Sequence, residues 1–231
     1  MENVNIQVIA RMHSDFATKF GIPRQSGLVE ELRSTIVFEP EYRNDDALRG
    51  IEAFTHLWVI WQFSEAVSAG WSPTVRPPRL GGNTRMGVFA TRSPFRPNNL
   101  GLSCVKLLGI EQTERHGTVL HVGGADLMDG TPIFDIKPYV PYADCHPEAS
   151  GGFTDTAGDF LLKVEFPDQL LSMLPADKRE AAVGVLSHDP RPSYQEDPQR
   201  IYGLSFAGLN VRFRVEGNSL TVTEITKEKN P

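Results

Sequence analysis

The chain has 231 residues, of which 40% are hydrophobic and 23% are charged, and its formal net charge is −6. These values are typical of a globular protein with one large domain, or one domain and a smaller addition, and they exclude a wholly disordered chain. The sequence has no apolar run long enough to cross a membrane, no basic start followed by an apolar stretch, and only two cysteines, Cys104 and Cys145, so we expect a cytoplasmic protein with reduced thiols.

Runs rich in β-branched and aromatic residues predict strands throughout the first two thirds of the chain. They are Asn5–Ala10, Ser34–Phe38, Leu57–Phe63, Met86–Thr91, Ser103–Ile110, Thr118–Val122 and Ile133–Tyr139. Clusters of Gly, Pro and Asn separate these runs, and Asp45 and Asp46 suit the start of a short helix. Many short strands with turns between them predict a barrel or a sandwich.

The pattern changes after residues 144–159, which are predicted to form a linker or a mobile loop. Helices are predicted at Asp168–Leu174 and Asp177–Ser187. Three further strands are predicted at Ile201–Phe206, Val211–Val215 and Leu220–Ile225, and they alternate well enough for a small antiparallel sheet. We therefore predict a mainly β protein, with a barrel-like domain over residues 4–145 and a small α+β domain over residues 146–231.

One stretch of the sequence is strongly basic, although the net charge of the whole chain is negative. Between Ala66 and Ile110 there is no Asp or Glu, while the same stretch carries +6, which leaves −12 on the rest of the chain. The positive charges are Arg76, Arg79, Arg85, Arg92, Arg96 and Lys106. Such a sector on an acidic body is what a phosphate-binding face requires, and an arginine-rich loop in solvent is the alternative.

Several common catalytic patterns are absent from the sequence. There is no glycine fingerprint after a strand, no phosphate-cradling loop, no H-E-x-x-H and no G-x-S-x-G. The adjacent residues Asp144, Cys145 and His146 do not converge easily on one ion, so we predict no metal site. An enzyme with this sequence therefore needs neither a metal nor a covalent nucleophile. Methyl transfer from a sulfonium fits this description, because the donor brings the activated carbon itself.

Two segments are dense in residues suited to ligand binding. Residues 79–103 place arginines, prolines and glycines in a turn, where prolines fix φ and glycines allow close backbone approach. Residues 126–139 contain the turn signal Asp129–Gly130, followed by Asp135 and Lys137 on one face of a strand. Taken singly, each segment is equally consistent with a tight hairpin that carries a surface ion pair.

Together, these and three other segments resemble the TsaA-like proteins, bacterial tRNA adenine-N6 methyltransferases that modify threonylcarbamoyladenosine (t6A) beside the anticodon. The resemblance rests on Pro23–Gly27, Gly50–Trp58, Gly87–Asn98, Asp129–Tyr139 and Asp189–Tyr194, in this order. It implies a single-sheet β-barrel that usually dimerises and binds S-adenosylmethionine near the subunit interface. Asn99 and Leu100 stand where the family commonly has proline and isoleucine. This departure affects the expected rigidity of that loop more than the resemblance itself.

The resemblance also implies cofactor contacts at positions that match the family motifs. These are Pro23, Arg24, Gln25, His56, Leu57, Arg92, Leu102, Asp129, Gly130, Thr131 and Pro132. Arg24 and Arg92 suit the carboxylate of the methionine moiety, which a guanidinium binds in a forked geometry. Asp129 suits a ribose or adenine hydrogen bond, or the sulfonium charge.

The implied partner is tRNA that decodes ANN codons, methylated on N6 of t6A at position 37 to give m6t6A. Arg85, Arg96 and Arg191 are candidates for the threonylcarbamoyl carboxylate or for phosphates, and Tyr194 is a candidate for stacking on a base. No residue is identified as a general base. Two alternatives stay open at this point: a barrel that binds RNA or a nucleotide without chemistry, and a methyltransferase with another acceptor.

Overall fold

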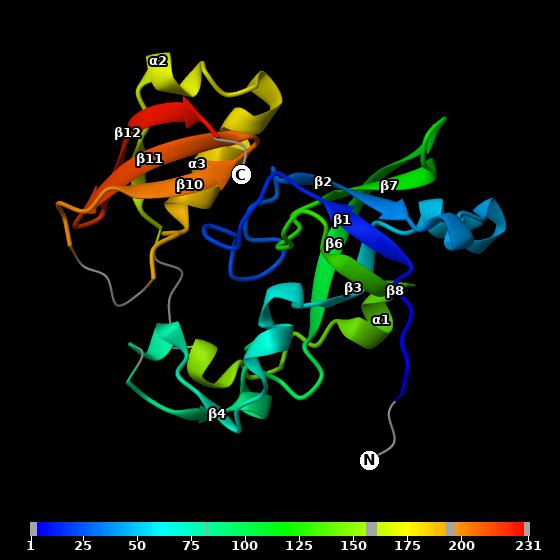
Figure 1. Ribbon diagram of the computed structural model, residues 1–231. Helices are drawn as coiled ribbons and strands as arrows, with labels where there is room; N and C mark the ends of the chain where they lie inside the picture. Colours follow the sequence, from blue (N-terminus) through cyan, green and yellow to red (C-terminus); the bar gives the residue numbers. More distant parts are fainter. Residues whose placement is uncertain (1–3, 82, 156–160, 193–196, 229–231) are drawn as a thin grey trace.

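Strands build most of the N-terminal part of the molecule (Figure 1). Burial alternates along several of them. The computed structural model describes residues 4–81, 83–155, 161–192 and 197–228. The large sheet consists of β1 (Ala10–His13), β2 (Arg33–Phe38), β3 (His56–Gln62), β6 (Leu100–Thr113), β7 (Gly117–Gly123) and β8 (Pro132–Pro138). These strands pair antiparallel in the order β1-β2-β7-β6-β3-β8, and β8 also pairs with β1, so the sheet closes into a barrel.

The barrel interior is filled by every second side chain of its strands, as the period of two requires. On β3, Leu57, Val59 and Trp61 are buried while their neighbours are only half-buried. They join one cluster with Met12, Ile36, Val105, Leu120 and Ile133 from the other strands. The predicted strand at Asn5–Ala10 was wrong in position, because β1 begins at Ala10 opposite Phe38. Beyond Phe38 the partner strand ends, since Pro40 lacks an N–H and starts a 3-10 helix.

A long insertion connects β3 to β6 and carries most of the basic sector. It contains 3-10 helices η4 (Ser64–Ala69), η5 (Pro78–Leu80) and η6 (Val88–Ala90), and the short pair β4 (Thr74–Val75) and β5 (Met86–Gly87). The predicted strand Met86–Thr91 was therefore largely wrong. Its partner β4 is flanked by Pro73 and Pro77, which cannot donate to a ladder, and the chain turns into η6 instead.

The C-terminal part is a second sheet with helices on one face. The strands are β9 (Lys163–Glu165), β10 (Tyr202–Phe206), β11 (Leu209–Glu216) and β12 (Ser219–Lys227), in the order β10-β11-β12-β9. The three predicted strands are present and antiparallel, whereas the short β9, parallel to β12, was not predicted. The helices are α2 (Asp168–Leu171), η8 (Ala176–Lys178) and α3 (Arg179–Ser187), so both predicted helices are present but shorter.

The remaining short elements lie in connections. They are η1 (Pro40–Tyr42), η2 (Asp45–Leu48), η3 (Ile51–Ala53), α1 (Pro141–Asp144) and η7 (Gly152–Thr154). The helix expected at Asp45 is η2, and the side chain of Asn44 caps it by accepting from the N–H of Asp46. In the part of the chain that the structure describes, no helix is both long and apolar enough to cross a membrane.

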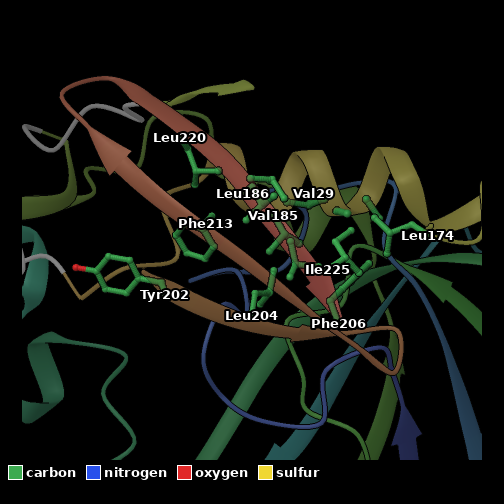
Figure 2. Close-up of a cluster of buried hydrophobic side chains, with 14 of the residues drawn as sticks. Val29, Leu174, Val185, Leu186, Tyr202, Leu204, Phe206, Phe213, Leu220 and Ile225 are labelled. Atoms are coloured by element: carbon green, nitrogen blue, oxygen red, sulfur yellow. The ribbon is translucent and has the colours of Figure 1, made fainter. Parts of the chain in front are cut away.

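The segment between β1 and β2 leaves the barrel and packs into the second core. Figure 2 shows Val29 beside Val185 and Leu186 of α3, in the same cluster as side chains of the C-terminal sheet. Phe16 and Leu32 belong to the same cluster. The N-terminal segment is thus shared between the two cores, although the expected division at residue 145 remains a prediction.

An ion pair and a close backbone contact also connect the segment between β1 and β2 to the C-terminal part. Lys178 Nζ lies 2.6 Å from Asp15 Oδ2, and both side chains are largely buried. A Cβ atom added at Gly21 would come within 2.1 Å of Leu204 on β10, so the backbone approaches that strand closely. Residues 23–25 follow directly after this close approach to β10.

Candidate functional site

A cavity of about 720 Å³ opens at the end of the barrel where β3 ends and β6 begins. Its wall is built from residues 22–25, from the end of β3 with the start of η4, from residues 91–96, from the start of β6, and from residues 126–131. This volume lies in the range of small-molecule sites. The basic insertion, the segment between β1 and β2, and the loop after β7 all meet here.

A chain of hydrogen bonds runs into this cavity from the barrel core. Trp61 Nε1 donates to Ser103 Oγ at 2.9 Å, and Ser103 Oγ donates to Asp126 Oδ1 at 2.6 Å. Trp61 and Ser103 are 7% and 1% exposed, so the chain is well shielded from water up to the carboxyl group. Trp61 and Asp126 both line the cavity.

The carboxyl group of Asp126 is perturbed by this environment. Burial raises the pKa of Asp126 above its ordinary value, although the hydrogen bond from Ser103, backbone N–H groups and the charge of Arg92 act in the opposite direction. A perturbed carboxyl group in a cavity is a candidate functional group. Sequence reasoning did not single out Asp126, Ser103 or Trp61, because only the pairing of distant strands brings them together.

Two exposed arginines, Arg24 and Arg92, lie at the wall of the cavity. Arg92 Nη1 donates to the side-chain oxygen of Gln25, and Gln25 Nε2 donates to the carbonyl oxygen of Arg24 at 2.5 Å. These bonds tie residues 24 and 25 to the basic insertion. Arg96 is held differently, because its Nη1 donates to the carbonyl oxygens of Thr91 at 2.7 Å and Val88 at 3.1 Å.

The structure brings part of the predicted site together. The predicted residues that line the cavity are Pro23, Arg24, Gln25, Arg92, Arg96, Leu102 and Thr131. They come from four segments that are distant in sequence. Their roles toward a cofactor remain predictions.

Other predicted cofactor residues lie outside this cavity. Leu57 is fully buried in the barrel core, and Pro132 is also buried. His56 lies five residues before Trp61, roughly 16 Å along an extended strand, and its ring is 6.2 Å from that of Tyr139. Asp129 Oδ1 lies 3.3 Å from His13 Nδ1 and accepts from the N–H of Ser14 at 3.1 Å. It begins the tight turn that continues at Gly130, where φ is 75°.

The candidates for substrate binding are also separated. Arg85 is exposed in the basic insertion. Arg191 forms a forked ion pair with Asp189 at 2.8 and 2.9 Å and borders a small hollow that Pro23 and Arg24 also line. Tyr194 lies outside the described residues. Among the residues that the structure does describe, no group of three or more His, Cys, Asp or Glu side chains could hold a metal ion.

Comparisons with known proteins agree over both parts of the chain. The family model described as the tRNA-methyltransferase O N-terminal domain matches residues 11–145, and that of the TrmO C-terminal domain matches residues 160–228. A tRNA (adenine(37)-N6)-methyltransferase of Escherichia coli is 41% identical over 223 residues, which cover 93% of this chain and 94% of the relative.

Two further relatives come from Pseudomonas aeruginosa. A putative S-adenosylmethionine-dependent methyltransferase, RcsF, is 39% identical and covers 90% of this chain and 91% of its own. A crystal structure of TrmO superimposes with a TM-score of 0.78 at 31% identity, covering 97% of this chain and 100% of the other. The similarity thus extends from sequence to the arrangement of both sheets.

Proposed function

The chain belongs to the tRNA-methyltransferase O family, and we propose on that basis that it is an S-adenosylmethionine-dependent tRNA (adenine-N6) methyltransferase. The acceptor is N6 of t6A at position 37, and the product is m6t6A. The names of the relatives support the reaction, the cofactor and position 37. The threonylcarbamoyl group, the two domains at 4–145 and 146–231, and a cytoplasmic location are our extensions of that support.

The cavity suits S-adenosylmethionine by volume and by the chemistry of its lining. Arg24 and Arg92 offer guanidinium groups to the methionine carboxylate. Trp61 and Phe63, whose ring centroids are 4.2 Å apart, offer apolar and aromatic surface, which favours a sulfonium and an adenine. When bound, the cofactor supplies an activated methyl group. We include the turn from Asp129 to Pro132, with His56 and Leu57, in the proposed site on the resemblance alone.

The protein's own contribution is positioning. The exocyclic amine of an adenosine is a weak nucleophile, because its lone pair is delocalised into the ring. Holding that amine in line with the methyl carbon and excluding water therefore supply much of the rate. The cavity wall suits the first role, since the ends of β3 and β6 and residues 91–96 line it from different sides.

The arginines divide into two groups by position. Arg96 lines the cavity and is held by backbone carbonyls, so we assign it to the threonylcarbamoyl carboxylate. Arg76 and Arg85 are exposed on the insertion and are assigned to tRNA phosphates. Arg191 and Tyr194 are placed at the anticodon loop on the resemblance. Leu102, Leu108 and Ile110 are exposed apolar side chains on β6, which supports a homodimer.

The observation that carries this proposal is a cavity with two arginines beside a basic insertion, in a chain whose two family matches span both sheets. The test incubates the protein with S-adenosylmethionine and tRNA, with and without the threonylcarbamoyl group, and analyses the nucleosides by mass spectrometry. We expect a gain of one methyl group on t6A alone.

Other outcomes point elsewhere. Methylation of unmodified adenosine at the same position would remove the requirement for t6A. No gain on any tRNA, with the cofactor bound in calorimetry, would indicate another acceptor. No binding of the cofactor would leave the barrel as an RNA-binding module without chemistry.

A further inference from the structure

We propose that Asp126 accepts the hydrogen bond of the acceptor amine and takes its proton after methyl transfer, and that Trp61 and Ser103 hold its carboxylate in place. The inference rests on the proposed function and deepens it, because it assigns a proton acceptor to the same cavity. Asp126 is not among the residues that the resemblance implies.

The hydrogen bonds fix the direction of the Ser103 hydroxyl. An indole N–H can only donate, so the oxygen of Ser103 must accept from Trp61 at 2.9 Å. The hydroxyl proton of Ser103 then has one direction left, toward Asp126 Oδ1 at 2.6 Å. The chain therefore presents Asp126 as an acceptor, with one oxygen held by Ser103 and the carboxyl group at the wall of the cavity.

An acceptor in this position calls for a donor from the ligand. The charged residues that line the same cavity are Lys19, Arg24, Glu65, Arg92 and Arg96. Of these, Arg92 favours the ionised form of Asp126 through its charge. The three arginines are already assigned to carboxylates of the two substrates. The N6 nitrogen of t6A carries one N–H, which donates a hydrogen bond and must lose its proton on methylation, so it is the group that a carboxylate complements.

The electrostatics of the site suit proton transfer. Burial raises the pKa of Asp126, which makes its carboxylate a better proton acceptor than an exposed one. Ser103 and Arg92 oppose that rise, because both favour the ionised form of the carboxyl group.

The step balances as follows. The lone pair of the exocyclic nitrogen forms the new N–C bond while the C–S bond breaks, and the electron pair of that bond stays on sulfur, which becomes a neutral thioether. The nitrogen, now cationic, transfers one proton to the Asp126 carboxylate. Asp126 is then a carboxylic acid, and it returns the proton to water after the product leaves.

The first test compares Asp126→Asn with Asp46→Asn, the same substitution at an exposed carboxylate that pairs with Arg49. We expect Asp126→Asn to keep the wild-type affinity for S-adenosylmethionine in calorimetry and to lower kcat for tRNA methylation by at least about 100-fold. Asp46→Asn should match the wild type in both. Loss of cofactor affinity in Asp126→Asn would show that the carboxylate holds the cofactor, and an unchanged kcat would show that it does not act.

The second test separates positioning from mere structure. Ser103→Ala removes a hydrogen bond that favours the ionised form of Asp126, so the acid limb of the kcat profile should move to higher pH, with KM little changed. Ser103→Thr, which keeps the hydroxyl, should restore the wild-type limb. If the acid limb of Ser103→Ala stays at the wild-type pH, Ser103 does not influence the ionisation of Asp126, and its positioning role is wrong.

Failure of the proposed function is distinguishable in the same assays. If the wild-type protein binds S-adenosylmethionine but methylates no tRNA, the proposed acceptor is wrong and this inference falls with it. If the wild type methylates tRNA and Asp126→Asn does so equally well, only the assignment of Asp126 is wrong. Thermal unfolding of each variant shows that a loss of rate is not a loss of fold.

Discussion

The indole ring of Trp61 lies directly against the backbone of Gly101, its partner on the neighbouring strand of the barrel. A Cβ atom at residue 101 would come 2.3 Å from Trp61 Cε2, a separation that side chains do not tolerate. Only glycine allows the ring to occupy this place, from which its N–H reaches Ser103.

Gly101→Ala should therefore destabilise the protein by about 1–3 kcal/mol, as overpacking of a core does, and should displace the indole from Ser103. Urea unfolding measures the first effect. The control is Gly109→Ala on the same strand, where an added Cβ meets nothing within 4 Å. Equal losses of stability in the two variants would contradict this account of the contact.

Arg92 should contribute to cofactor affinity through a charge-assisted contact with a carboxylate. Such bonds contribute about 1.5–3 kcal/mol, so Arg92→Ala should weaken S-adenosylmethionine binding about tenfold to a hundredfold. Calorimetry measures it, and Arg49→Ala, at an exposed ion pair with Asp46, is the matched control. An unchanged dissociation constant in Arg92→Ala would remove Arg92 from the cofactor site.

Asp126 should make stability depend on pH. Its folded-state pKa is raised by burial, so its stabilising contribution is present below the unfolded pKa and is lost as the pH rises through the folded pKa. Above its folded-state pKa, the ionised group thus destabilises the fold. Asp126→Asn should unfold at a higher temperature than the wild type near neutral pH, and the difference should shrink in acid. A lower melting temperature at neutral pH would contradict this sign.

The ion pair between Lys178 and Asp15 should stabilise the contact between the segment after β1 and η8 of the C-terminal part. Both side chains are mostly shielded, at 20% and 15% exposure, so removal of one partner leaves a poorly solvated charge. Lys178→Ala should reduce the free energy of unfolding by about 1–3 kcal/mol. The double variant with Asp15→Asn should lose less than the sum of the single variants, and strict additivity would show that the pair contributes nothing.

The basic insertion should make tRNA binding depend on salt. Each phosphate contact contributes about 0.7–0.9 to the slope of log affinity against log salt. Arg76→Ala and Arg85→Ala should each reduce that slope by about this amount, while Arg115→Ala, in the turn after β6, should not. Measurement of tRNA affinity across a salt series checks this prediction. Equal slopes for the wild type and all three variants would show that Arg76 and Arg85 do not contact tRNA phosphates.

The sequence by itself determined most strands, because burial on one face of a sheet imposes a period of two that is visible in the residues, as in Leu57, Val59 and Trp61. It also indicated the family, since motifs in a set order can be recognised without knowledge of the fold. Proline positions explain where strand prediction failed, at Met86–Thr91 and before Ala10, because a strand also needs a partner that can donate.

Only the tertiary structure decided which residues share the cavity. Trp61, Ser103 and Asp126 stand on separate segments, and the register between β3 and β6 brings the first two together. Likewise, Pro23 and Arg24 reach the cavity because residues between β1 and β2 pack into the C-terminal core. Strand register and packing depend on contacts between distant parts of the chain, and no local pattern in the sequence contains them.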